Sequence, residues 1–111
     1  MIYILREKAT KQQIQAMMEM LQTYIKLAVD IEREILTGGG AMHADCEAVL
    51  LEDGSQQEFI WGADWNPETQ EVTFESLINI RPRQNNRSLE LQDPELREKV
   101  EKVTRKLLGD V

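Results

Sequence analysis

Residues 59–80 read FIWGADWNPETQEVTFESLINI, and this stretch decides the fold expected for the whole chain. Its first part has an apolar residue at every second position, the spacing of one strand face. These residues are Phe59, Trp61, Ala63 and Trp65. Residues 66–69 carry a turn signal, and apolar and polar residues alternate again from Val72 to Ile80. We therefore predict an antiparallel hairpin with Trp61 opposite Phe74 and Ala63 opposite Val72.

Further strands are predicted upstream of this hairpin. Apolar and polar residues alternate over 25–32, which predicts a half-buried strand with an acidic end on its outer face, extended by residues 35 and 36. The glycines at 38–40 then interrupt regular structure. Residues 48–51 form a short apolar strand, and Asp53-Gly54-Ser55 predicts a hairpin turn. Residues 2–5 have strand composition and are interpreted as an edge strand or an apolar docking arm.

A helix is predicted near each end of the chain. A capping box followed by apolar residues at helical spacing predicts a helix over residues 10–22. Asp93 and Pro94 match the cap and the first position of a second helix. Its apolar stripe runs over residues 96–107, and Gly109 is expected to end it.

Together these elements predict an α+β fold. Short hairpin connections make successive strands antiparallel neighbours. We therefore predict an antiparallel meander of about four strands packed against the N-terminal and C-terminal amphipathic helices. The chain has 111 residues and a mass of 12.8 kDa, which suits a single domain over residues 1–111.

The charge of the chain restricts its partners. Its 20 acidic and 13 basic residues give a net charge of −7, which disfavours duplex nucleic acid because cations that neutralise phosphates supply affinity for it. The charge is also segregated, because residues 25–80 carry −10 whereas residues 1–24 carry +1 and residues 81–111 carry +2. This division favours pairing inside the monomer or association into a homo-oligomer.

No segment has the pattern of a targeting signal or a membrane span. The apolar residues 2–5 run directly into charged residues at 6–8, and no stretch approaches the ~20 apolar residues that cross a bilayer. We therefore expect a cytoplasmic protein without a membrane partner. Cys46, the single cysteine, has no internal disulfide partner and is expected to be a reduced thiol.

Several motifs together resemble a known family. They are Asp30-Ile31-Glu32; Gly38-Gly39-Gly40 leading to Met42-His43-Ala44-Asp45-Cys46-Glu47; Asp53-Gly54-Ser55; Trp61-Gly62-Ala63-Asp64; Ser76-Leu77-Ile78-Asn79-Ile80-Arg81-Pro82; Asn86-Arg87-Ser88; and Asp93-Pro94. Residues 24–108 are similar to a small family of uncharacterised prokaryotic proteins of unknown function, best represented in cyanobacteria. The resemblance implies no activity, cofactor or catalytic residue.

The first candidate site combines the only histidine with nearby carboxylates. His43, Asp45 and Glu47 follow the triple glycine, and alternation along an extended segment points them to one side. Imidazole and carboxylates suit a divalent metal ion such as Zn²⁺, Mn²⁺ or Fe²⁺, although the spacing matches no recognised zinc pattern. If the connection folds back, Asp30 or Glu32 is placed to act as a catalytic base.

Other features of the chain each have two interpretations. Cys46 with His43 as its base suits a nucleophile, but the neighbouring carboxylates oppose thiolate formation and favour a structural thiol. The glycines at 38–40 suit a phosphate loop, or a connection that needs positive φ angles. Trp61 and Trp65 suit stacking of a base or a sugar, or packing in the core or in a dimer interface.

The second candidate site is the arginine-rich loop after residue 78. Asn79, Arg81 and Arg87 are candidates for binding a small anionic ligand, because guanidinium groups hold carboxylates and phosphates bidentately. The alternative is that the arginines pair with the acidic sheet, within the monomer or across a dimer.

Three functions remain open. The leading hypothesis is a self-associating interaction module without catalytic activity. The second is a metal-dependent hydrolase in which His43, Asp45 and Glu47 bind the ion and Asp30 or Glu32 is the base. The third is a binding domain for a small anion or nucleotide at the Arg81–Arg87 loop.

Overall fold

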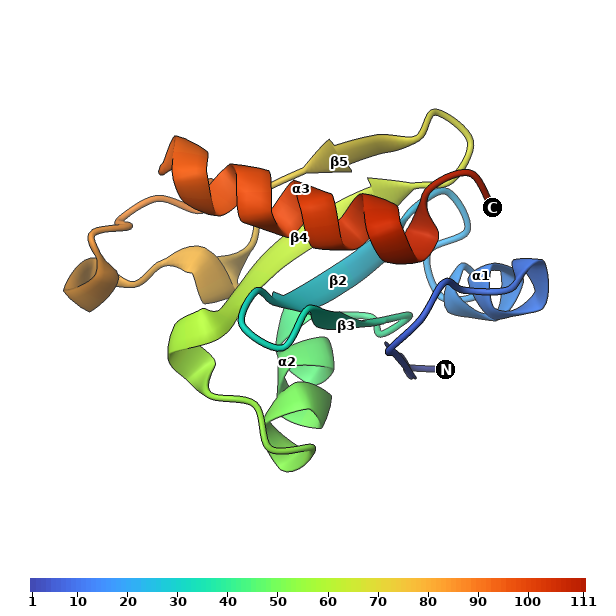
Figure 1. Ribbon diagram of the computed structural model, residues 1–111, viewed down its shortest axis with the longest axis horizontal. Helices are drawn as coiled ribbons and strands as arrows, with labels where there is room; N and C mark the ends of the chain where they lie inside the picture. Colours follow the sequence, from blue (N-terminus) through green and yellow to red (C-terminus); the bar gives the residue numbers. More distant parts are fainter.

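The computed structural model describes residues 1–111 and has an α+β fold built on one five-stranded sheet (Figure 1). The strands are β1 (Tyr3–Leu5), β2 (Ile25–Asp30), β3 (Ile35–Gly38), β4 (Ile60–Asn66) and β5 (Glu71–Thr73). Their order is β1-β3-β2-β4-β5, and every neighbouring pair is antiparallel. The predicted fold class is confirmed. The meander of about four strands is replaced by five strands, with β1 beside β3 at one edge.

Helices cover both faces of the sheet. They are α1 (Lys11–Met17), α2 (His43–Glu52) and α3 (Pro94–Leu108), with three short 3₁₀ helices, η1 (Gln57–Phe59), η2 (Leu77–Asn79) and η3 (Pro82–Gln84). α3 lies across one face, where it and α1 enclose a core cluster of 17 buried residues (Figure 1). α2 covers the other face over a cluster of five buried residues. None of these helices has the length and apolar character needed to cross a membrane.

Both terminal helices form, but the first is shorter than predicted. α3 begins behind Asp93, whose Oδ1 accepts the N–H of Glu95 at 2.8 Å, and Gly109 follows its last residue, as predicted. α1 has the predicted capping box. It ends at Met17 and not at residue 22, because the backbone passes into turns and Gln22 adopts a left-handed φ of 69°.

The prediction of an extended segment over residues 43–51 is wrong, because these residues form α2. Cys46 and Leu50 lie four residues apart and are both buried against the sheet, which is helical spacing. Asp53-Gly54-Ser55 is the end of this helix and not a hairpin turn. Gly54 has a φ of 104° and its N–H binds Leu51 O at 3.1 Å, while Ser55 N–H binds Leu50 O at 2.9 Å. These are the two bonds of a Schellman cap.

A turn separates two strands where a single extended strand was predicted. β2 ends at Asp30, and β3 starts at Ile35 and returns antiparallel beside it. Asp30 Oδ1 accepts the N–H groups of Glu32 and Arg33, both at 2.9 Å, and Glu34 adopts a φ of 55°. The carboxylate of Asp30 at this strand end therefore stabilises a turn.

The β4–β5 hairpin differs from the prediction in register and length. Trp65 lies opposite Val72, so the predicted pairs are shifted by two residues, a shift that leaves every side chain on its face. Trp61, Ala63 and Trp65 share the face under α3, as predicted, whereas Phe59 lies in η1. The strand predicted to reach residue 80 ends at Thr73. Beyond it, a side chain and not a strand pairs with β4.

Candidate functional site

Residues 76–89, between β5 and α3, form a projecting lobe that contains η2 and η3 (Figure 1, gold to orange). The lobe packs beside the first half of β4, since β5 pairs only with residues 64–66 of that strand. All three predicted anion-binding residues belong to it. The hydrogen bonds inside the lobe decide which of them are free to bind a ligand.

Asn79 takes the place of a missing strand at the edge of β4. Its Oδ1 accepts the N–H of Gly62 at 2.8 Å, and its Nδ2 donates to Gly62 O at 3.0 Å and to Phe74 O at 3.1 Å. The carboxamide thus reproduces the bonds of a paired peptide group. A glycine at position 62 lets the lobe lie this close to β4, because a Cβ there would lie 2.5 Å from the Cβ of Ser76. Asn79 is completely buried and its carboxamide is fully engaged.

Asn86 stabilises the other side of the lobe through hydrogen bonds of its side chain. Its Nδ2 donates to Asn79 O at 2.7 Å and to Ser88 O at 3.0 Å, and its Oδ1 accepts the N–H of Gln92 at 3.0 Å. Its backbone also pairs with that of Arg81 in an isolated bridge. Because Asn86 is buried, these bonds hold the lobe in one conformation.

Arg81 is held inside the molecule by all five N–H donors of its guanidinium group. The acceptors are Ile78 O, Gln57 O, Gln84 Oε1, Ile60 O and Glu47 Oε2. The contact with Glu47 on α2 is an ion pair at 3.4 Å, and the guanidinium carbon lies 4.4 Å from the centroid of the Trp61 ring. Burial lowers the pKa of Arg81, and the charge of Glu47 opposes that shift. Of the two predicted roles for the arginines, Arg81 has the internal pairing role.

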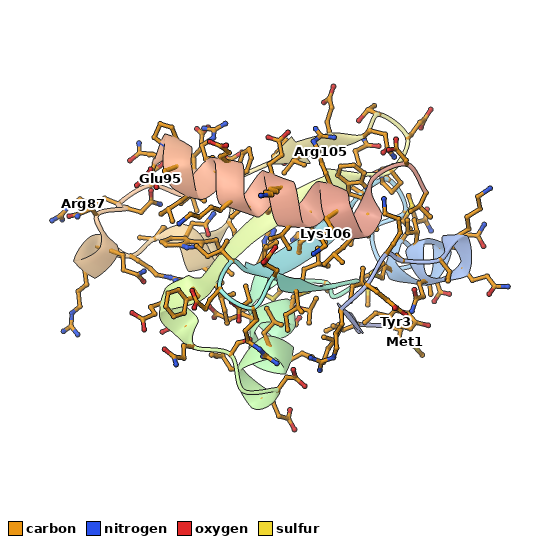
Figure 2. All side chains as sticks on the ribbon, viewed as in Figure 1. Met1, Tyr3, Arg87, Glu95, Arg105 and Lys106 are labelled. Carbon is orange, nitrogen blue, oxygen red and sulfur yellow. The ribbon has the colours of Figure 1, made fainter.

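The outer surface of the lobe carries aliphatic side chains and free arginines. Leu77 is 70% exposed, Ile80 43% and Leu89 40%. Arg83 and Arg87 are exposed and make no ion pair or side-chain hydrogen bond. Figure 2 shows Arg87 at the end of the molecule, with its side chain directed into solvent. Asn79 and Arg81 therefore serve the fold, and only Arg87 of the predicted anion-binding set is free.

The three predicted metal ligands do not face one common point. His43 Nε2 faces Asp64 Oδ1 at 2.9 Å and Ala63 O at 3.0 Å. Glu47 pairs with Arg81, and Asp45 is exposed two residues along the helix from His43, which puts it on the opposite side. Nowhere in the molecule do three His, Cys, Asp or Glu side chains gather closely enough to hold a metal ion.

The His43–Asp64 pair is a contact that sequence reasoning missed. Both neighbours of Nε2 are acceptors, so Nε2 is the donor in these contacts. Asp64 Oδ2 also accepts the hydroxyl of Thr73 at 3.3 Å. A hollow of about 300 Å³ lies beside the pair, lined by Thr23, Tyr24, Asp64, Asn66, Glu71 and Thr73. The alternation along β4 does turn Asp64 away from the tryptophans, but only the unpredicted helix α2 brings His43 to it.

The two candidate catalytic bases lie in the β2–β3 turn. Asp30 is completely buried, with Oδ1 bound to two backbone N–H groups and Oδ2 without any partner. Glu32 is exposed in the turn. Asp30 is level with Ile60 on β4, whereas His43 lies over Asp64, four residues along the same strand. The structure therefore does not bring the candidate bases to the candidate ligands.

The role of Asp30 in the turn makes a testable prediction. Asp30→Asn keeps the Oδ1 acceptor and exchanges one buried unpaired atom, Oδ2, for another, the amide nitrogen, so the free energy of unfolding should change by less than about 1 kcal/mol. Asp30→Ala leaves both N–H groups without an acceptor and should cost roughly 1–3 kcal/mol. Urea unfolding measures both. If Asn is as harmful as Ala, the charge of Asp30 matters and the turn role is insufficient.

The remaining candidate residues from the sequence occupy positions that serve the fold. Cys46 is buried, and desolvation, with a smaller contribution from Asp45, raises the pKa of its thiol, which opposes nucleophilic chemistry. Gly39 has a φ of 105°, which fits a connection that needs positive φ, and a Cβ there would collide with Met1 O. Trp61 and Trp65 are buried in the core, so their rings are closed to a base or a sugar.

Comparison with known families assigns the chain to a family but gives it no activity. A family described as a protein of unknown function (DUF5674) matches residues 3–107. The chain belongs to this family. The DUF5674 match runs from β1 through almost all of α3, so it covers the lobe and both predicted sites. The predicted resemblance to a family of unknown function is confirmed, and its cyanobacterial distribution stays a prediction. No curated protein and no solved structure matches the chain.

Proposed function

We propose that the protein is a self-associating interaction module without catalytic activity, and that two copies join at β1. The observation that carries the proposal is the open edge of this strand. β1 pairs with β3 on one side and has no strand on the other. Residues 1–5 contain no charged side chain. An apolar, uncharged edge is a template for pairing with another chain.

The opposite edge of the sheet supports the choice of β1. β5 carries the exposed residue Glu71 and follows a loop that contains Glu68, and charges of this kind discourage edge pairing. Next to β1, by contrast, the uncharged side chain of Met1 is 69% exposed. In a chain with a net charge of −7, β1 is a place where copies meet without bringing like charges together.

The expected dimer is closed and symmetric. Two β1 strands that pair antiparallel across a two-fold axis give one continuous sheet with five strands from each copy. Met1 and Tyr3 lie toward one end of the molecule, and Arg87 lies at the other (Figure 2). Pairing at β1 therefore leaves both lobes exposed.

The alternative functions gain no support from the arrangement of their residues. A metal-dependent hydrolase needs His43, Asp45 and Glu47 on one ion, but these side chains have different surroundings. An anion site at the Arg81–Arg87 loop needs Asn79 and Arg81, whose polar atoms are engaged internally.

Tyr3→Lys is expected to abolish the dimer, and Val72→Lys to leave it intact. Both residues are half-buried on edge strands and pack against the main core cluster, which makes them a matched pair. A lysine in β1 puts a charge at the pairing edge while its methylene groups still cover the core. Light scattering should show a mass falling from twice 12.8 kDa to 12.8 kDa for Tyr3→Lys alone.

Far-ultraviolet circular dichroism of both variants verifies that the fold is kept. A folded Tyr3→Lys protein that is still dimeric rejects β1 as the interface. Equal loss of the dimer in Val72→Lys also rejects it, because a lysine at either edge would then act through general destabilisation.

A further inference from the structure

We infer that the lobe is a docking site for an acidic segment with aliphatic side chains in a partner protein. This inference goes beyond self-association, because the lobe lies at the end of the molecule away from β1 (Figure 2). Residues 76–89 have three properties of a docking surface: a rigid backbone, uncompensated positive charge, and exposed aliphatic side chains.

The lobe is rigid because buried polar side chains fix it from inside. Asn79 binds the edge of β4, and Asn86 binds the backbone on both sides of the lobe. Arg81 binds one carbonyl oxygen of the lobe and two of other segments. A surface fixed before binding loses little conformational entropy when a partner docks. Functional loops are commonly positioned in this way by a rigid scaffold.

The charge of the lobe surface is positive and lacks an internal counter-ion. Arg83 and Arg87 are exposed and unpaired, whereas the charge of Arg81 faces Glu47. A hollow of about 360 Å³ lies beside Arg83, and no carboxylate lines it. Its lining residues are Gln57, Arg81, Pro82, Arg83 and Gln84. A carboxylate group complements this surface, because guanidinium groups bind it bidentately.

The aliphatic side chains distinguish a protein partner from a free anion. Leu77 begins η2 and Ile80 directly follows it, and the three-residue spacing of a 3₁₀ turn places such residues on one side. Leu89 O accepts the N–H of Ser76 at 3.0 Å, which sets Leu89 beside the start of η2. Arginine is enriched in protein interfaces, and apolar side chains form their buried core. Phosphate and nucleic-acid backbones offer no aliphatic groups to bury.

The test uses a synthetic peptide as the probe. Twelve residues that alternate leucine and aspartate with serine spacers are titrated into the isotope-labelled protein, and backbone amide shifts are recorded by NMR. We expect shifts confined to the lobe, residues 76–89, with a dissociation constant of about 0.1–1 mM. The same peptide with asparagine in place of aspartate should bind at least about fivefold more weakly.

Two double variants distinguish binding at the lobe from a general effect of the protein's net charge. Arg83→Ala with Arg87→Ala should weaken binding about fivefold to tenfold, because two exposed ion pairs are lost. Lys99→Ala with Lys102→Ala removes the same charge from the exposed face of α3 and should leave binding unchanged. Tyr3→Lys should bind as the unmodified protein does, so failure of the dimer proposal and failure of this one are separable.

Several results would overturn the inference. These are no shifts at saturating peptide, equal binding of the asparagine peptide, and equal weakening in the Lys99 and Lys102 variant. Inorganic phosphate or a single-stranded oligonucleotide that shifts the same residues more tightly than the peptide replaces the protein partner with an anion or a nucleic acid. Lobe shifts that follow protein concentration alone assign the surface to a second copy of this chain.

Discussion

Replacement of Asn79 by alanine should lower the free energy of unfolding by about 3–5 kcal/mol. The substitution removes three hydrogen bonds of 2.8–3.1 Å to Gly62 and Phe74. It also leaves buried backbone groups of β4 without partners, and each such group costs roughly 1–3 kcal/mol. The lobe should then detach from the edge of β4 before the core unfolds. Urea unfolding gives the free energy, and amide hydrogen exchange at Gly62 locates the change.

Two comparisons make the Asn79 result specific. Gln15→Ala removes an exposed amide from α1 and should change stability by less than about 0.5 kcal/mol. Asn79→Asp keeps the acceptor for Gly62 N–H but brings a buried charge toward carbonyl oxygens, so it should be at least as harmful as alanine. A cost below about 1 kcal/mol for Asn79→Ala would show that the carboxamide does not brace the lobe.

Arg81→Lys is expected to cost about 2–3 kcal/mol although it preserves the charge. Lysine has three donors on a flexible stem, whereas Arg81 satisfies five acceptors from η1, β4, α2 and its own lobe with one planar group. Lysine also loses the stack on Trp61, where the guanidinium carbon is 4.4 Å from the ring centroid. Chemical unfolding monitored by tryptophan fluorescence measures the loss.

Arg83→Lys is the matched control for Arg81→Lys. Arg83 lies in the same lobe but is exposed and unpaired, so its replacement should be neutral within about 0.5 kcal/mol. Equal effects at the two positions would mean that the internal contacts of Arg81 contribute nothing measurable. A large effect at Arg81 alone identifies it as a structural arginine and not as an anion receptor.

The elements that were predicted correctly are those with local signals. α3 has a capping aspartate, a proline at its first position, an apolar stripe and a terminal glycine, all within residues 93–109. The shared face of Trp61, Ala63 and Trp65 follows from alternation alone. Signals of this kind need no knowledge of distant residues, and they survive in the structure.

α2 was missed because its sequence fits two structures. Asp53-Gly54-Ser55 is compatible with a hairpin turn and with a Schellman cap, since both use a glycine at positive φ. The short apolar run before it suits a strand or one helix face. Contact of Cys46 and Leu50 with the sheet selects the helix, and that contact lies between segments far apart in sequence.

The role of the candidate site residues also depends on contacts between segments that are far apart in sequence. The residue types of the arginine-rich loop suggested either a site for a small anion or internal pairing of the arginines. In Asn79 and Arg81 the bound groups are mostly backbone atoms of other segments, because residues 76–89 fold over the unpaired edge of β4. No local sequence pattern indicates which edge of a sheet lacks a neighbouring strand. Arg83 and Arg87 are exposed on the surface of the same lobe.

Sedimentation equilibrium of the unmodified protein over a wide dilution series tests the central proposal most directly. A self-associating module should show a mass that rises with concentration from 12.8 kDa toward twice that value and goes no further, because a closed two-fold interface admits two copies. A constant mass of 12.8 kDa up to the highest soluble concentration would contradict self-association. Growth beyond two copies would contradict the closed pairing of β1.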